Sequence, residues 1–335
     1  MIVALSTFAA CAAVIIFCGI RLSKYGDIIA EKSGMGKAWF GLIMMSSVTS
    51  LPELVSGISS VTLIDAPNLA IGDVVGSCMF NILILSVLDF LYKKGPISSH
   101  VQQSQILGAG FCIILTATLL GSLMFQQYIP NLAWVGMYSV AFTLVYFIAM
   151  RVIYSYEQRK NAQINNDEVP SHAHHDVSLK KATQYYLLNA LFVIIAAIFL
   201  PHAGEQIAES TGLGQSFVGT ILIAASTSLP ELVVSISALR IGAVDIAVGN
   251  LFGSNLFNIF ILAIDDVFYF KGGLLSSASK SNMITLLTVL IMTGIAIVGL
   301  VFQQEKKRWR MAIDTMAIAV VYVIGMFLLY YSRNL

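Results

Sequence analysis

Charged residues are scarce in this sequence. Only 11% of its 335 residues are Asp, Glu, Lys or Arg, whereas 57% are hydrophobic. Soluble globular domains carry about 25% charged residues, so this composition argues against a water-soluble fold. The 19 Lys and Arg residues form no patch with interleaved aromatic residues, and we expect no nucleic-acid partner. The composition predicts a protein that lies in a lipid bilayer.

Cysteine is also rare. The four cysteines, at positions 11, 18, 78 and 112, lie singly within apolar stretches, without paired spacing. This pattern argues against a disulfide framework and against a zinc site, and we expect these thiols to pack as small apolar groups. The N-terminal apolar run lacks the basic start and the cleavage site of a signal peptide, so we predict a retained first helix. Nothing indicates a covalent cofactor.

Long apolar runs are abundant by contrast. A membrane-spanning helix needs about 20 mostly apolar residues. Ten runs meet this requirement, near residues 2–20, 37–62, 68–92, 103–125, 131–154, 183–204, 213–239, 244–269, 282–302 and 310–331. We therefore predict an all-α membrane protein with ten transmembrane helices.

A polar linker, residues 155–182, separates two five-span halves, residues 1–154 and 183–335. Loops after the odd-numbered spans hold 16 of the 19 Lys and Arg residues. Basic loops face the cytoplasm, so we predict a cytoplasmic linker and both termini outside. The linker is too short to fold as a regulatory domain, and no protein partner is indicated. Its His172–His175 cluster fits either a transition-metal site or chance histidines in a solvated segment.

The two halves share sequence. Thr49–Val55 recurs without change as Thr227–Val233, and Gly72–Ile82 is echoed by Gly249–Ile259. The copies fall on spans 2 and 3 and on spans 7 and 8, so each half has five helices in the same order. Because five is odd, the halves must insert with opposite orientations. This predicts two inverted five-helix repeats, an architecture that in transporters places the ion site at the repeat interface.

Each repeat carries a proline in mid-span. Pro52 and Pro230 remove a backbone hydrogen bond and hinder the carbonyl four residues earlier. We expect broken helices with freed carbonyls near Ser47, Val48 and Ser226, which are then available as ligands. A simple proline kink, stabilised by neighbouring helices, is the alternative for either copy alone.

A glutamate follows each of these prolines. Glu53 and Glu231 have no Lys or Arg within their core segments. A carboxylate at the bilayer centre costs at least about 2.5 kcal/mol, and two that face each other repel. A divalent cation, sodium ions or protons would relieve that repulsion, or hydrogen bonds would hold two neutral acids. Further oxygen donors, which suit calcium or sodium, are Thr49, Ser50, Ser77, Asn81, Thr227, Ser228, Ser254 and Asn258.

Other acids carry weaker predictions. Asp89 and Asp266 correspond across the repeat at the ends of spans 3 and 8, where a solvated carboxylate is favoured over an interhelical lock or part of an access path. Asp73 lies near the start of its span, where it would cap the helix. An intramembrane aspartyl protease would need an aspartate opposite Asp73, but the matching residue is Asn250. A passive cation channel would share oxygen-lined pathways, although paired half-sites favour alternating access.

The paired Thr-Ser-Leu-Pro-Glu and Gly-x-x-Gly-Ser-x-x-x-Asn segments resemble the two α-repeats of the sodium/calcium exchanger family, within the calcium/cation antiporter superfamily. The resemblance spans the chain and implies calcium–sodium antiport in the plasma membrane of a prokaryote. It implies Glu53 and Glu231 as acidic ligands, with the carbonyls of Thr49 and Thr227 completing a calcium site. Flanking sodium sites and the border of the centre would then use Ser50, Ser77, Ser228, Ser254, the carbonyls of Ser46 and Ala224, and the amides of Asn81 and Asn258.

The resemblance also has a departure. The family usually has glycine where Val48 and Ser226 stand, which bears on sodium stoichiometry and ion identity. Proton-coupled members of the superfamily typically carry Gly-Asn-Ala-x-Glu, which is absent here. This favours sodium as the driving ion, with a proton-coupled antiporter as the alternative. By the same resemblance, spans 1 and 6 would slide past the rest to open the site to each side in turn.

Overall fold

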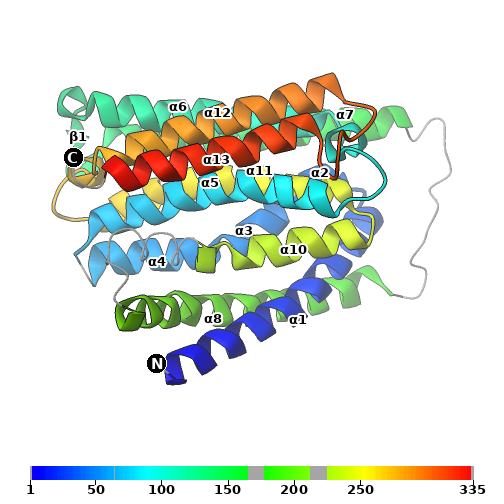
Figure 1. Ribbon diagram of the computed structural model, residues 1–335, viewed down its shortest axis with the longest axis horizontal. Helices are drawn as coiled ribbons and strands as arrows, with labels where there is room; N and C mark the ends of the chain where they lie inside the picture. The colour runs from blue at the N-terminus through cyan, green and yellow to red at the C-terminus, as the bar shows by residue number, and fades with distance from the viewer. Residues whose placement is uncertain (1, 64, 165–176, 212–224, 333–335) are drawn as a thin grey trace.

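The computed structural model describes residues 2–63, 65–164, 177–211 and 225–332, which are almost entirely helical (Figure 1). The longer elements are α1 (Ile2–Ser33), α2 (Lys37–Trp39), the π-helical turn η1 (Phe40–Met45), α3 (Ser46–Thr49), α4 (Leu51–Thr62), α5 (Pro67–Leu91), α6 (Ser104–Met124), α7 (Met137–Ile164), α8 (Leu179–Thr211), α10 (Leu229–Arg240), α11 (Val244–Phe268), α12 (Ser281–Phe302) and α13 (Ile313–Ser332). Short connecting elements are the 3₁₀ turns η2 (Ile97–His100), η3 (Gln126–Tyr128) and η4 (Leu274–Ser277), and an antiparallel hairpin of β1 (Asn131–Leu132) and β2 (Val135–Gly136).

Seven described helices are long and apolar enough to cross a membrane. These are α1, α5, α6, α7, α11, α12 and α13. The segments Lys37–Thr49 and Leu51–Thr62, bent by 41° at a short break, meet the same criterion together and make an eighth. Helix α1 continues past the predicted end at residue 20, because Arg and Lys are good helix formers and only the apolar part of a helix must lie in lipid.

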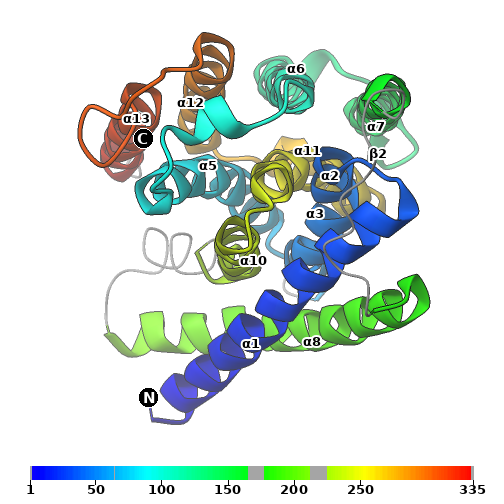
Figure 2. The same cartoon turned by 90° about the vertical axis from the view of Figure 1, so that its right-hand side faces the viewer.

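Two helices run through the centre of the bundle. In the most apolar stretch of α11, 89% of the residues are buried, and in that of α5 67% are, against 17% for α13. Figure 2 shows α11 surrounded by the other helices. An apolar helix that is covered on all sides has no polar face to turn toward water. Polar groups on α5 and α11 must therefore find partners, or an ion, inside the protein.

Glycines bring α11 against the segment before the break. A Cβ atom at Gly253 would overlap the Leu42 carbonyl oxygen and lie 2.6 Å from the Ser46 hydroxyl. A Cβ at Gly249 would lie 2.9 Å from the Ala38 carbonyl oxygen. Small residues allow such close backbone approach between membrane helices. The glycines of the repeated motif thus set the distance between α11 and the broken helix.

Replacing Gly253 is expected to destabilise the fold. Gly253→Ala adds a methyl group that must displace backbone, and such overpacking costs about 1–3 kcal/mol. The melting temperature of the purified protein in detergent should fall. Gly294→Ala on α12 is the matched control, because a Cβ there meets nothing within 4 Å. Alanine favours a helix over glycine by about 1 kcal/mol, so this control should melt no lower than the wild type. Equal melting temperatures for the two variants would contradict the packing argument.

Asp89 and Asp266 are not solvated, contrary to the sequence-based interpretation. Both are 0% exposed. Asp89 Oδ1 accepts the Ile97 N–H at 2.8 Å, and Oδ2 accepts the Ala312 N–H at 2.7 Å and the Thr315 hydroxyl at 2.8 Å. The Lys307 ammonium lies 3.1 Å from Oδ1. The carboxylate therefore locks the end of α5 to the start of α13.

Asp266 makes the equivalent lock in the other half of the chain. Its Oδ1 accepts the Leu274 N–H at 2.7 Å and the Tyr138 hydroxyl at 2.8 Å. Its Oδ2 accepts the Gly136 N–H at 2.8 Å and the Ser139 hydroxyl at 2.6 Å. This carboxylate locks the end of α11 to the start of α7. The two aspartates thus hold corresponding helix ends together by the same kind of contacts.

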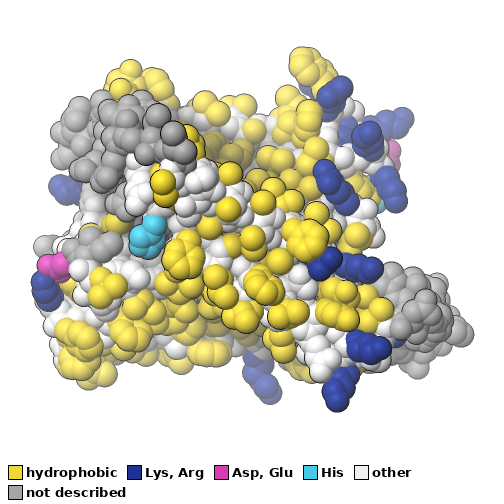
Figure 3. All heavy atoms as spheres, turned by 90° about the horizontal axis from the view of Figure 1, so that it is seen from below, with side chains coloured by type: hydrophobic (Ala, Val, Ile, Leu, Met, Phe, Trp, Pro, Cys, Tyr) yellow, Lys and Arg dark blue, Asp and Glu magenta, His cyan; other side chains and the backbone are white. Residues whose placement is uncertain are grey.

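The outer surface has an apolar middle and one basic end. Figure 3 shows hydrophobic side chains over the middle of one face and Lys and Arg gathered at the right-hand end. Large apolar side chains on α7, α12 and α13 are exposed, as expected for contact with lipid. Figure 2 shows α1 and α8 crossing each other on one side of the remaining helices. The His172–His175 cluster lies outside the described residues.

Candidate functional site

The two copies of the repeated motif break the helix at the same residue. Ser50 separates α3 from α4 with φ −92° and ψ 9°, and Ser228 precedes α10 with φ −85° and ψ 7°. Pro52 and Pro230 stand in the first turn of the following helix, where their missing N–H groups are tolerated. Each glutamate comes directly after its proline, so each copy places a carboxylate in the first turn of the helix that follows the break.

The glutamates and serines of the two copies contact each other reciprocally. Glu53 and Glu231 are both 0% exposed. The Ser50 hydroxyl donates to Glu231 Oε1 at 3.0 Å, and the Ser228 hydroxyl donates to Glu53 Oε1 at 3.4 Å. The serine at each break therefore supports the carboxylate of the other copy, although 181 and 175 residues separate these partners.

Threonine and serine side chains surround this pair. The Ser254 hydroxyl of α11 donates to Glu231 Oε1 at 3.3 Å and lies 3.4 Å from the Thr49 hydroxyl. On the other side, the Ser77 hydroxyl of α5 lies 3.3 Å from the Thr227 hydroxyl. All four hydroxyl-bearing residues are 0% exposed. The central helices α5 and α11 thus each add one hydroxyl opposite a threonine of the broken helices.

Two asparagines lie one helical turn after Ser77 and Ser254 on the central helices. Asn81 and Asn258, on α5 and α11, are 0% exposed. Asn81 Nδ2 donates to the Asn255 side-chain oxygen at 3.1 Å, and Asn255 in turn donates to the Cys78 carbonyl at 3.1 Å. Both polar atoms of Asn258 have no hydrogen-bond partner. The Asn255 side chain therefore bridges the two central helices.

Several buried oxygens of this cluster are not used by the protein. Glu53 Oε2, Glu231 Oε2 and Asn81 Oδ1 lack hydrogen-bond partners, as does the Asn258 amide. Buried polar atoms are normally bonded, so such a concentration needs a physical reason. A hard cation bound by oxygen atoms would provide it. Among the described residues, no three Asp, Glu, His or Cys side chains converge as a metal cluster, so any cation here depends on hydroxyl, amide and carbonyl oxygens as well.

Of the Ser46 and Ala224 carbonyls, which the family resemblance implies as sodium ligands, only that of Ser46 lies within the described residues. The Ser46 carbonyl accepts the Ser50 N–H at 2.9 Å and the Thr49 hydroxyl at 3.2 Å, so an ion there would replace one of these bonds. Ala224 lies outside the described residues. Ser226, where the family usually has glycine, is 3% exposed, and Val48 is half-buried.

Three buried residues of this region, Asp73, Asn250 and Asp265, were not predicted as site residues from the sequence. Asp73 does not cap α5, because the helix begins six residues earlier, and it instead accepts the Thr227 hydroxyl at 3.2 Å. Asn250 accepts the Thr49 hydroxyl at 3.1 Å and donates to Ser235 at 3.1 Å. The repeat alignment pairs Asp73 with Asn250, and this correspondence was the available signal. Asp265, also buried, has no acidic counterpart in the repeat.

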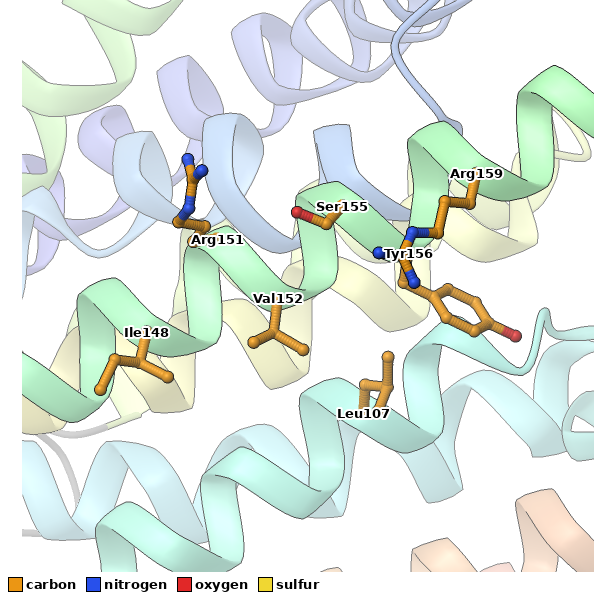
Figure 4. Close-up of a pocket in the computed structure, with 7 residues that line it drawn as sticks. All are labelled: Leu107, Ile148, Arg151, Val152, Ser155, Tyr156 and Arg159. Atoms are coloured by element: carbon orange, nitrogen blue, oxygen red, sulfur yellow. The ribbon is translucent and has the colours of Figure 1, made fainter.

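A groove between α6 and α7 does not suit a cation (Figure 4). It presents two arginines and no carboxylate. Its lining residues are Leu107, Ile148, Arg151, Val152, Ser155, Tyr156 and Arg159.

Comparison with known proteins gives consistent matches. The family described as sodium/calcium exchanger protein matches residues 3–155 and 181–331. The chain is 27% identical to the sodium/calcium exchanger MaX1 of Methanosarcina acetivorans, over 92% of this chain and 93% of the relative. It is 24% identical to the inner membrane protein YrbG of Escherichia coli, over 74% of each. The solved structure of the sodium-calcium exchanger NCX_Mj superposes with a TM-score of 0.73 at 19% identity, over 97% of this chain and 98% of that one, which shows a shared fold.

Proposed function

Because this chain belongs to the sodium/calcium exchanger protein family, we propose that it is a secondary antiporter that exchanges calcium for sodium by alternating access. The observation that carries the proposal is the reciprocal contact of Ser50 with Glu231 and of Ser228 with Glu53. Two buried carboxylates brought together without Lys or Arg among the described contacts need a cation to offset their repulsion.

The proposed ion site uses the cluster described above. Calcium binds Glu53 and Glu231 with the backbone carbonyls of Thr49 and Thr227. Sodium ions occupy flanking positions when calcium is absent. Their ligands are Ser50, Ser77, Ser228 and Ser254, the carbonyls of Ser46 and Ala224, and the neighbouring amides of Asn81 and Asn258. The unpartnered oxygens of both glutamates support this assignment.

The proposed architecture is ten membrane helices in two inverted repeats, residues 1–154 and 183–335, joined by the linker 155–182. Matching helix breaks at Ser50 and Ser228 support it, because both have nearly the same backbone angles. The locks at Asp89 and Asp266 support it further, since each joins the end of a central helix to a helix of the other half.

Alternating access would come from movement of α1 and α8. These helices pack against each other on one side of the molecule (Figure 2). Few polar contacts hold α1 to the core, among them the Ser23 hydroxyl donating to the Val234 carbonyl at 2.9 Å. Sliding over apolar side chains breaks few directional bonds, which suits a moving pair.

The proposed location is the plasma membrane of a prokaryote, with both termini outside. The asymmetry of basic residues supports this orientation, because cytoplasmic loops are rich in Lys and Arg. In Figure 1 the start of α1 and the end of α13 lie in the left half of the view, whereas the basic end in Figure 3 is on the right.

Sodium coupling is tested with purified protein in lipid vesicles. We expect ⁴⁵Ca²⁺ uptake into sodium-loaded vesicles to depend on an outward sodium gradient. With three or more sodium ions per calcium, an imposed membrane potential should also change the rate, since one elementary charge across 100 mV is worth about 2.3 kcal/mol. Vesicles loaded with potassium instead of sodium are the control.

Uptake that ignores the sodium gradient but follows a pH gradient would replace sodium coupling with proton coupling. Discrete single-channel current steps would instead indicate a passive channel.

A further inference from the structure

Two buried acids lie beyond the proposed ion site. Asp73 on α5 is 2% exposed, and Asp265 on α11 is 0% exposed. Neither oxygen of Asp265 has a hydrogen-bond partner, and Asp73 Oδ2 also lacks one. Asp73 Oδ1 accepts the Thr227 hydroxyl at 3.2 Å, which ties this acid to the edge of the site.

Both acids lie on the same side of the glutamate pair. Asp265 faces α4 at Gly57, one helical turn beyond Glu53, and a Cβ atom at Gly57 would lie 2.7 Å from Asp265 Oδ1. Asp73 lies one turn from Ser77 along α5, in the direction of the same end. Both acids therefore lie between this end of the bundle and Glu53, with Asp265 against α4 and Asp73 at the Thr227 hydroxyl.

The series starts near one identifiable end of the bundle. Asp65, between α4 and α5, forms an exposed ion pair with Lys271, just after α11, at 2.5 Å. The hydrogen bond and charge of Asp65 raise the pKa of Lys271. We call this the Asp65 end, and the proposed topology places it outside the cell. The Lys271 ammonium is already paired, and among the described residues no cation contacts Asp73 or Asp265.

The positions that correspond to these acids across the repeat carry no acids. The residues that correspond to Asp73 and Asp265 at an offset of 177 are Asn250 and Leu88. Asn250 is neutral and bonded through both its oxygen and its nitrogen. Leu88 is 0% exposed in the apolar core. The path from the Asp65 end to the glutamates therefore carries two acidic side chains, whereas the matching positions on the path from the opposite end are uncharged.

We propose that Asp73 and Asp265 form a second cation site, which holds calcium as it passes between the Asp65 end and the glutamate pair. Two carboxylates with the neighbouring Thr227 hydroxyl offer hard oxygen ligands. Their double negative charge suits a divalent ion better than sodium. The empty side of Gly57 is what lets the Asp265 carboxylate reach α4. The transport role rests on the proposed antiport, whereas the binding site itself does not.

The first test measures the KM for calcium from each side of the membrane. Right-side-out and everted vesicles are loaded with sodium, and labelling of Asp65→Cys by an impermeant maleimide identifies the preparation that exposes the Asp65 end. We expect Asp73→Asn and Asp265→Asn to raise the KM at that end at least about tenfold, because each removes one of two charges that attract the ion. The KM at the opposite end should not change.

Asp65→Asn is the matched control, since it removes the same charge from the surface of the same end. Its KM should equal that of the wild type. An unchanged KM in Asp73→Asn and Asp265→Asn, or an equal rise at both ends, would overturn the proposal. Asp73→Asn introduces the residue that the fold already accepts at position 250, so it decides the question if Asp265→Asn does not assemble.

The second test measures calcium binding to the purified protein in detergent, without transport. The wild type should show two binding steps, and Asp73→Asn and Asp265→Asn should each lose the weaker one. Glu53→Gln should instead lose the tighter step. Identical titrations for the wild type and the two aspartate variants would overturn the second site. The binding titration does not depend on transport. It can therefore show the second site to be wrong or right even if the protein proves not to be an antiporter.

Discussion

Glu53→Gln and Glu231→Gln are each expected to reduce sodium-driven calcium exchange at least about 100-fold. Glutamine keeps the size of the side chain but removes its charge and one oxygen ligand. Removing one partner from a buried charge interaction costs about 3–5 kcal/mol, and each tenfold in affinity is about 1.4 kcal/mol. Initial rates of ⁴⁵Ca²⁺ uptake in reconstituted vesicles, at calcium concentrations near the wild-type KM, measure the loss.

Glu157→Gln is the matched control for these two variants. Glu157 is 1% exposed, neither of its carboxylate oxygens has a hydrogen-bond partner, and it lies on α7, which supplies no residue of the proposed site. The chemical change and the burial are therefore the same. Exchange by Glu157→Gln should match the wild type, and normal exchange by either Glu53→Gln or Glu231→Gln would remove that glutamate from the site.

The repeated motif explains why so many residues of the site could be identified from sequence. A seven-residue segment that occurs twice without change holds its carboxylate, hydroxyl and proline in fixed relation to one another. Proline breaks the helix in both copies for a local reason, so a helix break shortly before Pro52 and before Pro230 could be predicted without knowing the fold. The crossing of each serine to the other copy could not, because it depends on how the halves pack.

Asp265 shows where this reasoning stops. Asp265 has no acidic counterpart in the repeat, whereas its neighbour Asp266 corresponds to Asp89. A comparison of the two repeats therefore selects Asp266, and it does not select Asp265, which we propose to bind the ion. Its direction toward α4 is set by Gly57, more than 200 positions away in sequence. Because the position of the Asp265 side chain depends on space next to a distant glycine, the sequence around Asp265 contains no pattern that would predict it.

Asp89 and Asp266 were misinterpreted for a related reason. A charge at the end of an apolar run usually meets water, which made solvation the favoured expectation. Thr315, which donates to Asp89, is 226 residues away in sequence, and Ser139 is 127 residues from Asp266. The burial of these acids follows from loops and helices that fold back over the ends of α5 and α11.

Asp89→Asn is expected to destabilise the protein by about 3–5 kcal/mol, because it leaves the Lys307 ammonium without its counter-charge in a buried place. The Lys307 side chain is 11% exposed and also donates to the carbonyls of Asp89 and Tyr92. Replacing both members should cost less than replacing Asp89 alone, since Asp89→Asn with Lys307→Met removes the stranded charge. Thermal unfolding in detergent of the two single variants and the double variant measures this coupling energy.

The exposed pair Asp65 and Lys271 provides the comparison for this double-mutant cycle. Their side chains are 56% and 64% exposed, so solvent and salt screen the attraction between them. The same substitutions, Asp65→Asn and Lys271→Met, should show no measurable coupling. If the Asp89→Asn and Lys307→Met variants also showed no coupling energy, the ion pair would contribute nothing to holding α5 against α13. The end of α5 would then be held by the bonds from Ile97, Ala312 and Thr315 and by those from Lys307 to the carbonyls of Asp89 and Tyr92.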